Sequence, residues 1–83
     1  MVNKSVVVKN SVGIHDKVTP FIIQKANSFT CSIWIEKDER RVNAKSLLGV
    51  LSMVLMDGMT VNVIADGEGD EQAVNEISKL LSE

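Results

Sequence analysis

Two segments of this 83-residue chain alternate apolar and polar residues. In residues 31–37 every second side chain is apolar, namely Cys31, Ile33 and Ile35. In residues 60–66 the same holds for Val61, Val63 and Ala65. A period of two is typical of a strand with one buried face. A sheet built from such strands has one face on the core and one in water, so we expect all helices to cover a single face.

The remaining segments predict the other elements. Residues 2–8 are rich in β-branched residues and predict a first strand. After a loop at residues 10–13 we expect a helix that runs to about Ser28. Its apolar positions recur at helical spacing: Phe21, Ile22, Ala26 and Phe29. Asp38-Glu39 predicts a hairpin turn before a short edge strand at residues 41–43.

Two further helices follow. A short helix is expected from Ser46 to about Leu55, ended by Asp57-Gly58 with Gly58 in the left-handed conformation. Asp70 is expected to cap a last helix whose buried stripe is Ala73, Val74, Ile77, Leu80 and Leu81. The order β-α-β-β-α-β-α predicts an α+β fold, a split βαβ arrangement with an added C-terminal helix, in one domain over residues 1–83.

The composition of the chain argues against several classes of function. Nine Lys and Arg face eleven Asp and Glu, a balance that argues against non-specific nucleic-acid binding. With one cysteine and one histidine, the chain has no internal disulfide and no four-ligand zinc site of the usual kind, and we expect no cofactor. Cys31 is expected in the core. Trp34 is expected on the open sheet face as an isolated exposed aromatic that neighbouring side chains cover, and the alternative is a contact surface. No signal-peptide pattern is present and the longest nearly apolar run, residues 47–56, is too short for a membrane span, so we expect a cytoplasmic protein.

The single histidine, in Gly13-Ile14-His15, is the first candidate site. Histidine has an unperturbed pKa near neutrality, so a neutral ring nitrogen is available as a nucleophile at cell pH. Free backbone N–H groups at a helix start can bind an added phosphate. The alternative is an ordinary surface or cap residue. Two helix starts remain open: Asp16, with Pro20 inside the helix, or Pro20 itself as the first helical residue.

Ser46 is the second candidate site. It is a good N-cap for a helix that is apolar almost all round, and this helix cannot be buried on every side in so small a domain. We therefore expect an exposed apolar patch among Leu47, Leu48 and Leu51, of the kind that marks an interaction surface. A phosphate on Ser46 would add about −1.5 to −2 charges beside this patch. The alternative is a helix cap with no regulatory role.

These residues together resemble the HPr family, the histidine-containing phosphocarriers of the sugar phosphotransferase system. The resemblance rests on Gly13-Ile14-His15, Lys45-Ser46, Gly49-Val50, the element order and the length. It implies an open-faced sandwich with a four-stranded antiparallel sheet and three helices. It also implies that His15 accepts a phosphoryl group on Nδ1 from Enzyme I, charged by phosphoenolpyruvate, and donates it to Enzyme IIA domains. Such a protein is not an enzyme, because its partners supply the catalysis.

The same resemblance implies a regulatory role for Ser46. In many low-GC Gram-positive members of the family an ATP-dependent HPr kinase/phosphorylase modifies this serine, and the phosphorylated form binds a catabolite control transcription factor. The active-site loop departs from the family pattern Gly-Ile-His-Ala-Arg-Pro: Asp16 adds a negative charge, Lys17 replaces the arginine that neutralises the phosphate, and Val18 replaces the proline. The alternative function is therefore that of catabolite-repression HPr homologues, acting through phospho-Ser46. Because His15 and Ser46 would each begin a helix on one surface, we also expect their phosphates to repel each other.

Overall fold

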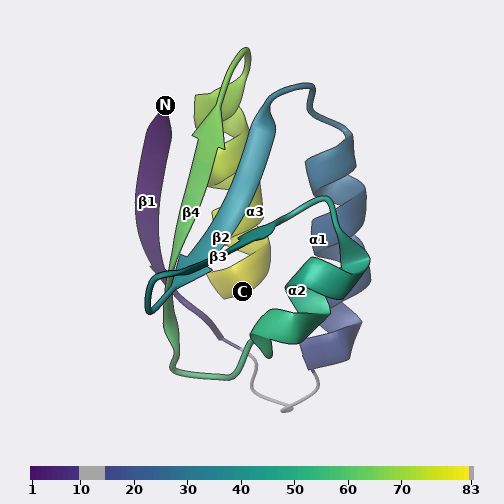
Figure 1. Ribbon diagram of the computed structural model, residues 1–83, viewed down its shortest axis with the longest axis vertical. Coiled ribbons are helices and arrows are strands. Elements are labelled where there is room, and N and C mark those ends of the chain that lie inside the picture. Colours follow the sequence, from purple (N-terminus) through teal and green to yellow (C-terminus); the bar gives the residue numbers. More distant parts are fainter. Residues whose placement is uncertain (10–14, 83) are drawn as a thin grey trace.

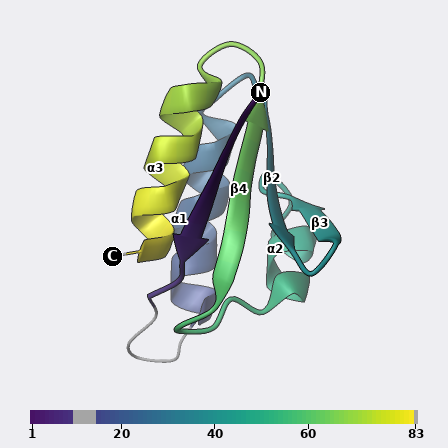
Figure 2. The same ribbon diagram turned by 90° about the vertical axis from the view of Figure 1, so that its left-hand side faces the viewer.

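The computed structural model describes residues 1–9 and 15–82, with side chains from 1–9 and 19–82. Its elements, in chain order, are β1 (Val2–Val7), α1 (His15–Asn27), β2 (Ser32–Lys37), β3 (Arg40–Asn43), α2 (Leu47–Met53), β4 (Thr60–Asp66) and α3 (Asp70–Ser82). The strands form one antiparallel sheet in the order β1-β4-β2-β3. Figures 1 and 2 show α1 and α3 side by side along one face of this sheet, with α2 next to α1. The predicted fold class and element order are confirmed.

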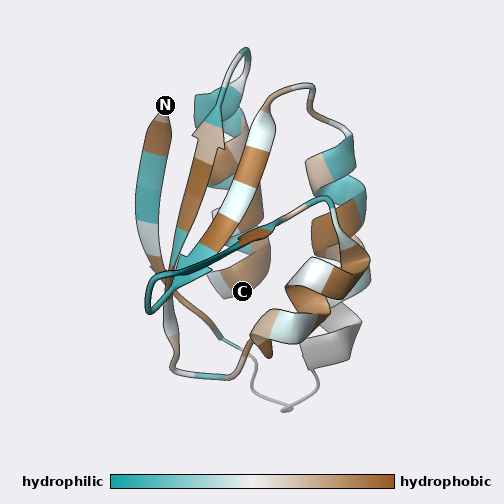
Figure 3. Ribbon diagram, in the orientation of Figure 1, coloured by the Kyte–Doolittle hydropathy of each residue, from teal (hydrophilic) through white to brown (hydrophobic). Residues whose placement is uncertain are grey.

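The alternating strands place one apolar face against the helices. Ile35 of β2 pairs with Val63 of β4, Ile33 pairs with Ala65, and all four side chains are buried. Figure 3 shows the alternation as bands of different hydropathy along β2. Because cross-strand neighbours share a face, this register turns every apolar side chain of the pattern toward the core.

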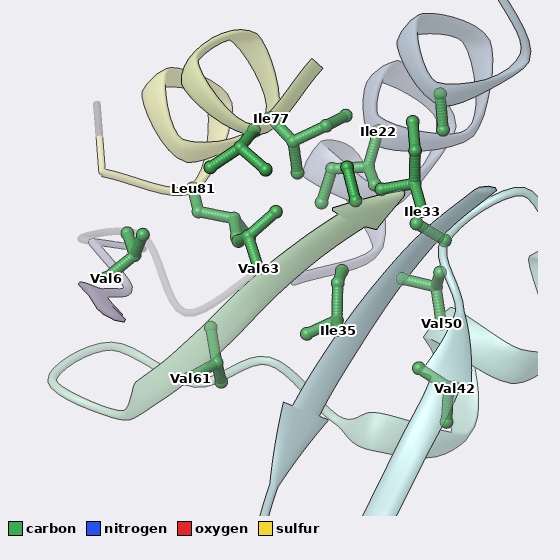
Figure 4. Close-up of a cluster of buried hydrophobic side chains, with 14 of the residues drawn as sticks. Val6, Ile22, Ile33, Ile35, Val42, Val50, Val61, Val63, Ile77 and Leu81 are labelled. Carbon is green, nitrogen blue, oxygen red and sulfur yellow. The ribbon is translucent and has the colours of Figure 1, made fainter. Parts of the chain in front are cut away.

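The helices close the core from the other side. Figure 4 shows Ile22 of α1 and Ile77 and Leu81 of α3 pointing toward Val63 and the other strand residues. The three helical side chains are at most 1% exposed. Burying a side chain of this size contributes about 1.5–3 kcal/mol relative to leaving it in water. Cys31 also lies in this core, as expected.

On the opposite face of the sheet, neighbouring side chains cover Trp34. Trp34 pairs in register with Ile64, which is 1% exposed although its β4 neighbours Val63 and Ala65 face the core. The Arg41 guanidinium lies 5.5 Å from the Trp34 ring centroid and also binds Glu36 at 3.3 Å. The expectation that neighbouring side chains cover Trp34 is therefore confirmed.

The hairpin between β2 and β3 turns where the sequence predicts. Asp38 and Glu39 both have positive φ, at 50° and 67°. This is the backbone of a type I′ turn, whose twist matches that of paired strands. Glycine is the usual residue at its second position, so Glu39 holds a conformation that a side chain disfavours.

Two expectations for α2 are wrong. The helix ends at Met53, two residues before Leu55, and Val54 takes the left-handed position at its end, with φ 51° and ψ 77°. Gly58 is left-handed as expected, with φ 85°, but it lies in the loop after the helix and does not end it. Leu55 is 2% exposed and packs in the core. The chain therefore leaves the helix early so that Leu55 can turn inward, and a β-branched residue takes a backbone conformation that usually favours glycine.

The apolar stripes of α1 and α3 also differ from expectation. Phe21 is 60% exposed, whereas Thr19 is buried together with Ile22 and Ala26. In α3, Leu80 is only partly buried and Ser78 is 4% exposed, and Asp70 is the first helical residue instead of the residue before it. Phe21 and Leu80 line a shallow groove between the two helices. Spacing alone identified the two helices but assigned Phe21 and Leu80 to buried faces on which Thr19 and Ser78 lie instead.

Candidate functional site

His15 is the first residue of α1. The first backbone N–H groups of a helix have no partner within it and carry the positive end of the helix dipole. Residues 10–14, which include Gly13 and Ile14, and the side chains of His15 to Val18 lie outside the described part of the chain. The backbone position of His15 is therefore established, and the roles of His15 and Lys17 remain predictions.

The question of the helix start has a definite answer. Pro20 lies inside α1, at its sixth position, and its side chain is exposed. Of the two starts that the sequence left open, the one at Pro20 is wrong, and the helix begins at His15, one residue before Asp16. Pro20 has no N–H, so one bond to the Asp16 carbonyl is missing from the helix. The early start keeps His15 at the helix N-terminus, where an anion is favoured.

Ser46 caps α2 as predicted. Its backbone is extended, with φ −100° and ψ 118°, and its Oγ accepts a hydrogen bond from the Gly49 N–H at 3.1 Å. A Cβ at position 49 would lie 3.3 Å from both Cβ and Oγ of Ser46 and 3.4 Å from the Asn43 carbonyl oxygen. Glycine at 49 therefore leaves space beside the serine hydroxyl, which is the atom that a kinase would modify.

Two hydrogen bonds hold the segment before Ser46 against the C-terminal end of α1. Lys45 Nζ donates to the Phe29 carbonyl at 2.7 Å, and Asn27 Nδ2 donates to the Lys45 carbonyl at 3.4 Å. Asn27 is the last residue of α1 and His15 is the first. With a rise of about 1.5 Å per residue, His15 lies on the order of 18 Å from Asn27 along α1, and we take this length as the approximate separation of the two candidate sites.

This separation changes one expectation. Both sites do begin helices, but they lie near opposite ends of α1. The Debye length at physiological ionic strength is about 8 Å, so a phosphate at one site acts only weakly on the other through the solvent. The direct repulsion expected from the sequence stays a prediction, and at this separation we expect it to be weak.

The predicted apolar patch is present and larger than expected. Leu47 and Leu48 are 51% and 80% exposed, and Leu51 is partly exposed. Sequence reasoning missed that Val54 and Met56 continue this surface, at 46% and 62% exposed. We call these five residues, 47, 48, 51, 54 and 56, the α2 surface. Figure 3 shows that the ribbon of α2 carries only apolar and near-neutral residues. A patch of this kind typically marks a site of protein contact.

Among the residues whose side chains are described, no group of three His, Cys, Asp or Glu side chains is placed to hold a metal ion. Within the same part of the chain, every helix is too short or too polar to cross a membrane.

Known proteins resemble this chain over nearly its whole length. Residues 2–83 match the model of the PTS-HPr family, described as PTS HPr component phosphorylation site. An HPr-like protein Crh from Halalkalibacterium halodurans is 38% identical over 98% of this chain and 96% of its own length. The crystal structure of a phosphocarrier protein HPr from Bacillus anthracis has a TM-score of 0.91 at 31% identity, covering 98% of this chain and 96% of that one. The solution structure of Crh, the Bacillus subtilis catabolite repression HPr, has a TM-score of 0.74 at 33% identity, covering 99% and 98%.

Proposed function

Because the chain belongs to the HPr family, we propose that it is a phosphocarrier of the phosphoenolpyruvate-dependent sugar phosphotransferase system, with all 83 residues acting as one domain and His15 as the phosphoryl acceptor. The observation that carries the proposal is the position of the single histidine at the first residue of α1. The neutral imidazole nitrogen attacks the phosphorus of phospho-Enzyme I, the bond to the Enzyme I histidine breaks, and the phosphoryl group moves to His15. In a second transfer His15 is the donor, and the phosphoryl group passes to an Enzyme IIA domain.

In this proposal the chain supplies the groups that bind the phosphate and neutralise its charge, while the partner enzymes supply the catalysis. The free N–H groups of the first turn of α1 donate to the phosphoryl oxygens. Lys17 neutralises part of the negative charge but lacks the planar fork of an arginine, so it holds the phosphate by charge more than by geometry. We expect phosphorylation to be slower than in an arginine-containing relative.

The test is phosphorylation by Enzyme I and phosphoenolpyruvate, followed by intact mass. One added phosphate that is lost in acid and absent from the His15→Ala variant supports the proposal. Lys17→Gln should slow the transfer severalfold and Lys17→Arg should restore or raise it, whereas Lys25→Gln, in the same helix, serves as the matched control. Transfer to folded His15→Ala at the unaltered rate would refute the assignment.

A second function is favoured by the α2 surface. We propose that an HPr kinase/phosphorylase phosphorylates Ser46 and that phospho-Ser46, together with Leu47, Leu48 and Leu51, binds a catabolite control transcription factor. The support is the exposed apolar helix directly behind a capped serine, and the likeness to proteins named Crh. A phosphate in the cap position lies at a helix N-terminus, so it adds charge beside the α2 surface without unfolding the helix.

Binding of phosphorylated and unmodified protein to the transcription factor tests this second function. Leu48→Asp should abolish binding of the phosphorylated form with little change in stability, since Leu48 is 80% exposed. Phe21→Asp is the matched control, because Phe21 is also exposed but lies in the groove between α1 and α3. Equal binding of the two forms, or equal loss in both variants, would contradict the proposal.

A further inference from the structure

A groove lies between β1 and α3, and Ser5, Val6 and Val7 of β1 form part of its lining. It has a volume of about 390 Å³ and is bordered by Lys4 and Lys9 of the β1 segment and by Asn75, Ser78, Lys79 and Ser82 of α3. Figure 2 shows β1 running alongside α3 toward its C-terminal end. The Lys9 N–H donates to the Leu81 carbonyl at 2.8 Å, which fixes one end of the groove. Among the described strands, β1 pairs with β4 alone, so it lies at the edge of the sheet.

The charges of this groove are unbalanced. Outside it, each lysine or arginine with a described side chain has a partner: Lys25 with Glu76, Lys37 with Asp38, Arg41 with Glu36, Arg40 with Ser52 and Lys45 with the Phe29 carbonyl. Within the described part of the chain, Lys4, Lys9 and Lys79 form no ion pair or side-chain hydrogen bond, and all three border this one groove. No acidic residue lines it. In a chain of net charge −2, this gathering of free cations produces a local positive field.

A buried hydroxyl supplies an independent observation. Ser78 is 4% exposed and lines the groove, and its Oγ has no hydrogen-bond partner in the described structure. The hydroxyl of Ser82, one turn later, donates to the Ser78 carbonyl at 2.8 Å, so the helix backbone there is already satisfied. A buried hydroxyl without a partner is unfavourable and calls for an explanation. A bound anion provides one, because the hydroxyl can turn about its Cα–Cβ bond and donate to an anionic oxygen.

We propose that this groove binds a small phosphorylated molecule, with Lys4, Lys9 and Lys79 neutralising the phosphate and Ser78 donating to one of its oxygens. Three ammonium groups match a phosphate ester or pyrophosphate group, which carries two or more negative charges, better than a single carboxylate. The volume is that of a small-molecule site. The proposal does not depend on phosphoryl transfer at His15 or on modification of Ser46.

The experiment is a titration of the full ¹⁵N-labelled chain with inorganic pyrophosphate, followed by NMR at constant ionic strength. Saturable shifts should centre on the backbone amides of residues 4–9 and 75–82. Each exposed charge pair contributes an affinity factor of about two to five, so Lys4→Gln/Lys79→Gln should weaken binding about tenfold. Lys25→Gln/Lys37→Gln changes the net charge equally outside the groove and should change the affinity less than twofold.

Ser78→Ala separates a ligand role from a structural one. It removes a hydroxyl that has no partner, so the fold should be as stable or more stable, while pyrophosphate binding should weaken severalfold. Equal losses in the two double lysine variants, or shifts that never saturate, would show non-specific charge binding and overturn the proposal. Unchanged pyrophosphate affinity in Ser78→Ala would show that Ser78 does not donate to the ligand, and it would overturn the site as proposed. Tighter binding of a poly-glutamate peptide at the same residues would overturn the small-molecule assignment in favour of an acidic polypeptide.

Discussion

Phosphorylation of Ser46 should barely affect the intrinsic reactivity of His15. The two sites lie on the order of 18 Å apart, because α1 has 13 residues and Ser46 is tied to its far end through Asn27 and Lys45. Two phosphoryl groups of about two negative charges each, at that distance in water, repel by about 0.9 kcal/mol. Screening with a Debye length of about 8 Å reduces this to about 0.1 kcal/mol at 0.15 M salt. Such a difference changes a rate constant by about 20%.

A small phosphoryl donor isolates this effect from protein contacts. Potassium phosphoramidate transfers its phosphoryl group to an imidazole nitrogen and releases ammonia, so it needs no docking on α2. The assay compares unmodified protein with protein carrying phosphoserine at 46 by intact mass over time, with His15→Ala as the background. We expect rates within about 20% of each other at 0.15 M salt. With Enzyme I as donor, the phosphoserine form should react more slowly if Enzyme I covers the α2 surface, because the added charge is then desolvated at the interface.

The result that refutes the reasoning is a clear effect with the small donor. A drop of more than twofold in the phosphoramidate rate at 0.15 M salt, reversed by removal of the Ser46 phosphate, would mean that the two phosphates communicate through the protein. The distance along α1 would then not govern their coupling.

Three further predictions concern the backbone and are measured by urea unfolding. Pro20→Ala should stabilise the protein by about 1–3 kcal/mol, because alanine restores the hydrogen bond to the Asp16 carbonyl and Pro20 is exposed; a loss of stability would indicate a helix that starts at Pro20. Glu39→Gly should stabilise by about 1 kcal/mol through relief of the positive φ at the hairpin, and a destabilised variant would argue against the type I′ turn. Ser46→Ala should destabilise by about 1 kcal/mol through loss of the cap to Gly49, while Ser46→Asp, which can still cap, should not; equal values for both would show that the cap contributes nothing.

Local periodicity predicted secondary structure most reliably for elements that have one face on the core. The β2 and β4 strands, the Asp38-Glu39 turn and the Ser46 cap follow from neighbouring residues, and all appear where predicted. The α2 surface also followed from the sequence, since a helix apolar all round exceeds what so small a core can cover.

Features that depend on distant neighbours were missed. The end of α2 depends on the burial of Leu55, which requires core space made by other elements, so Val54 and not Gly58 takes the position that ends the helix, although both residues have a positive φ. The exposure of Phe21 depends on where α3 lies against α1. Short-range spacing identifies a helix but does not specify which neighbour covers each side of it.

By itself, therefore, the sequence determined the element order, the single buried sheet face and the two candidate residues, because these follow from residue type and from periods of 2 and 3.6. Only the tertiary structure decided the separation of His15 from Ser46 and the gathering of Lys4, Lys9 and Lys79 around Ser78. The physical reason is chain topology: β1 and α3 lie at opposite ends of the sequence, and only packing on one sheet brings their side chains to a common groove.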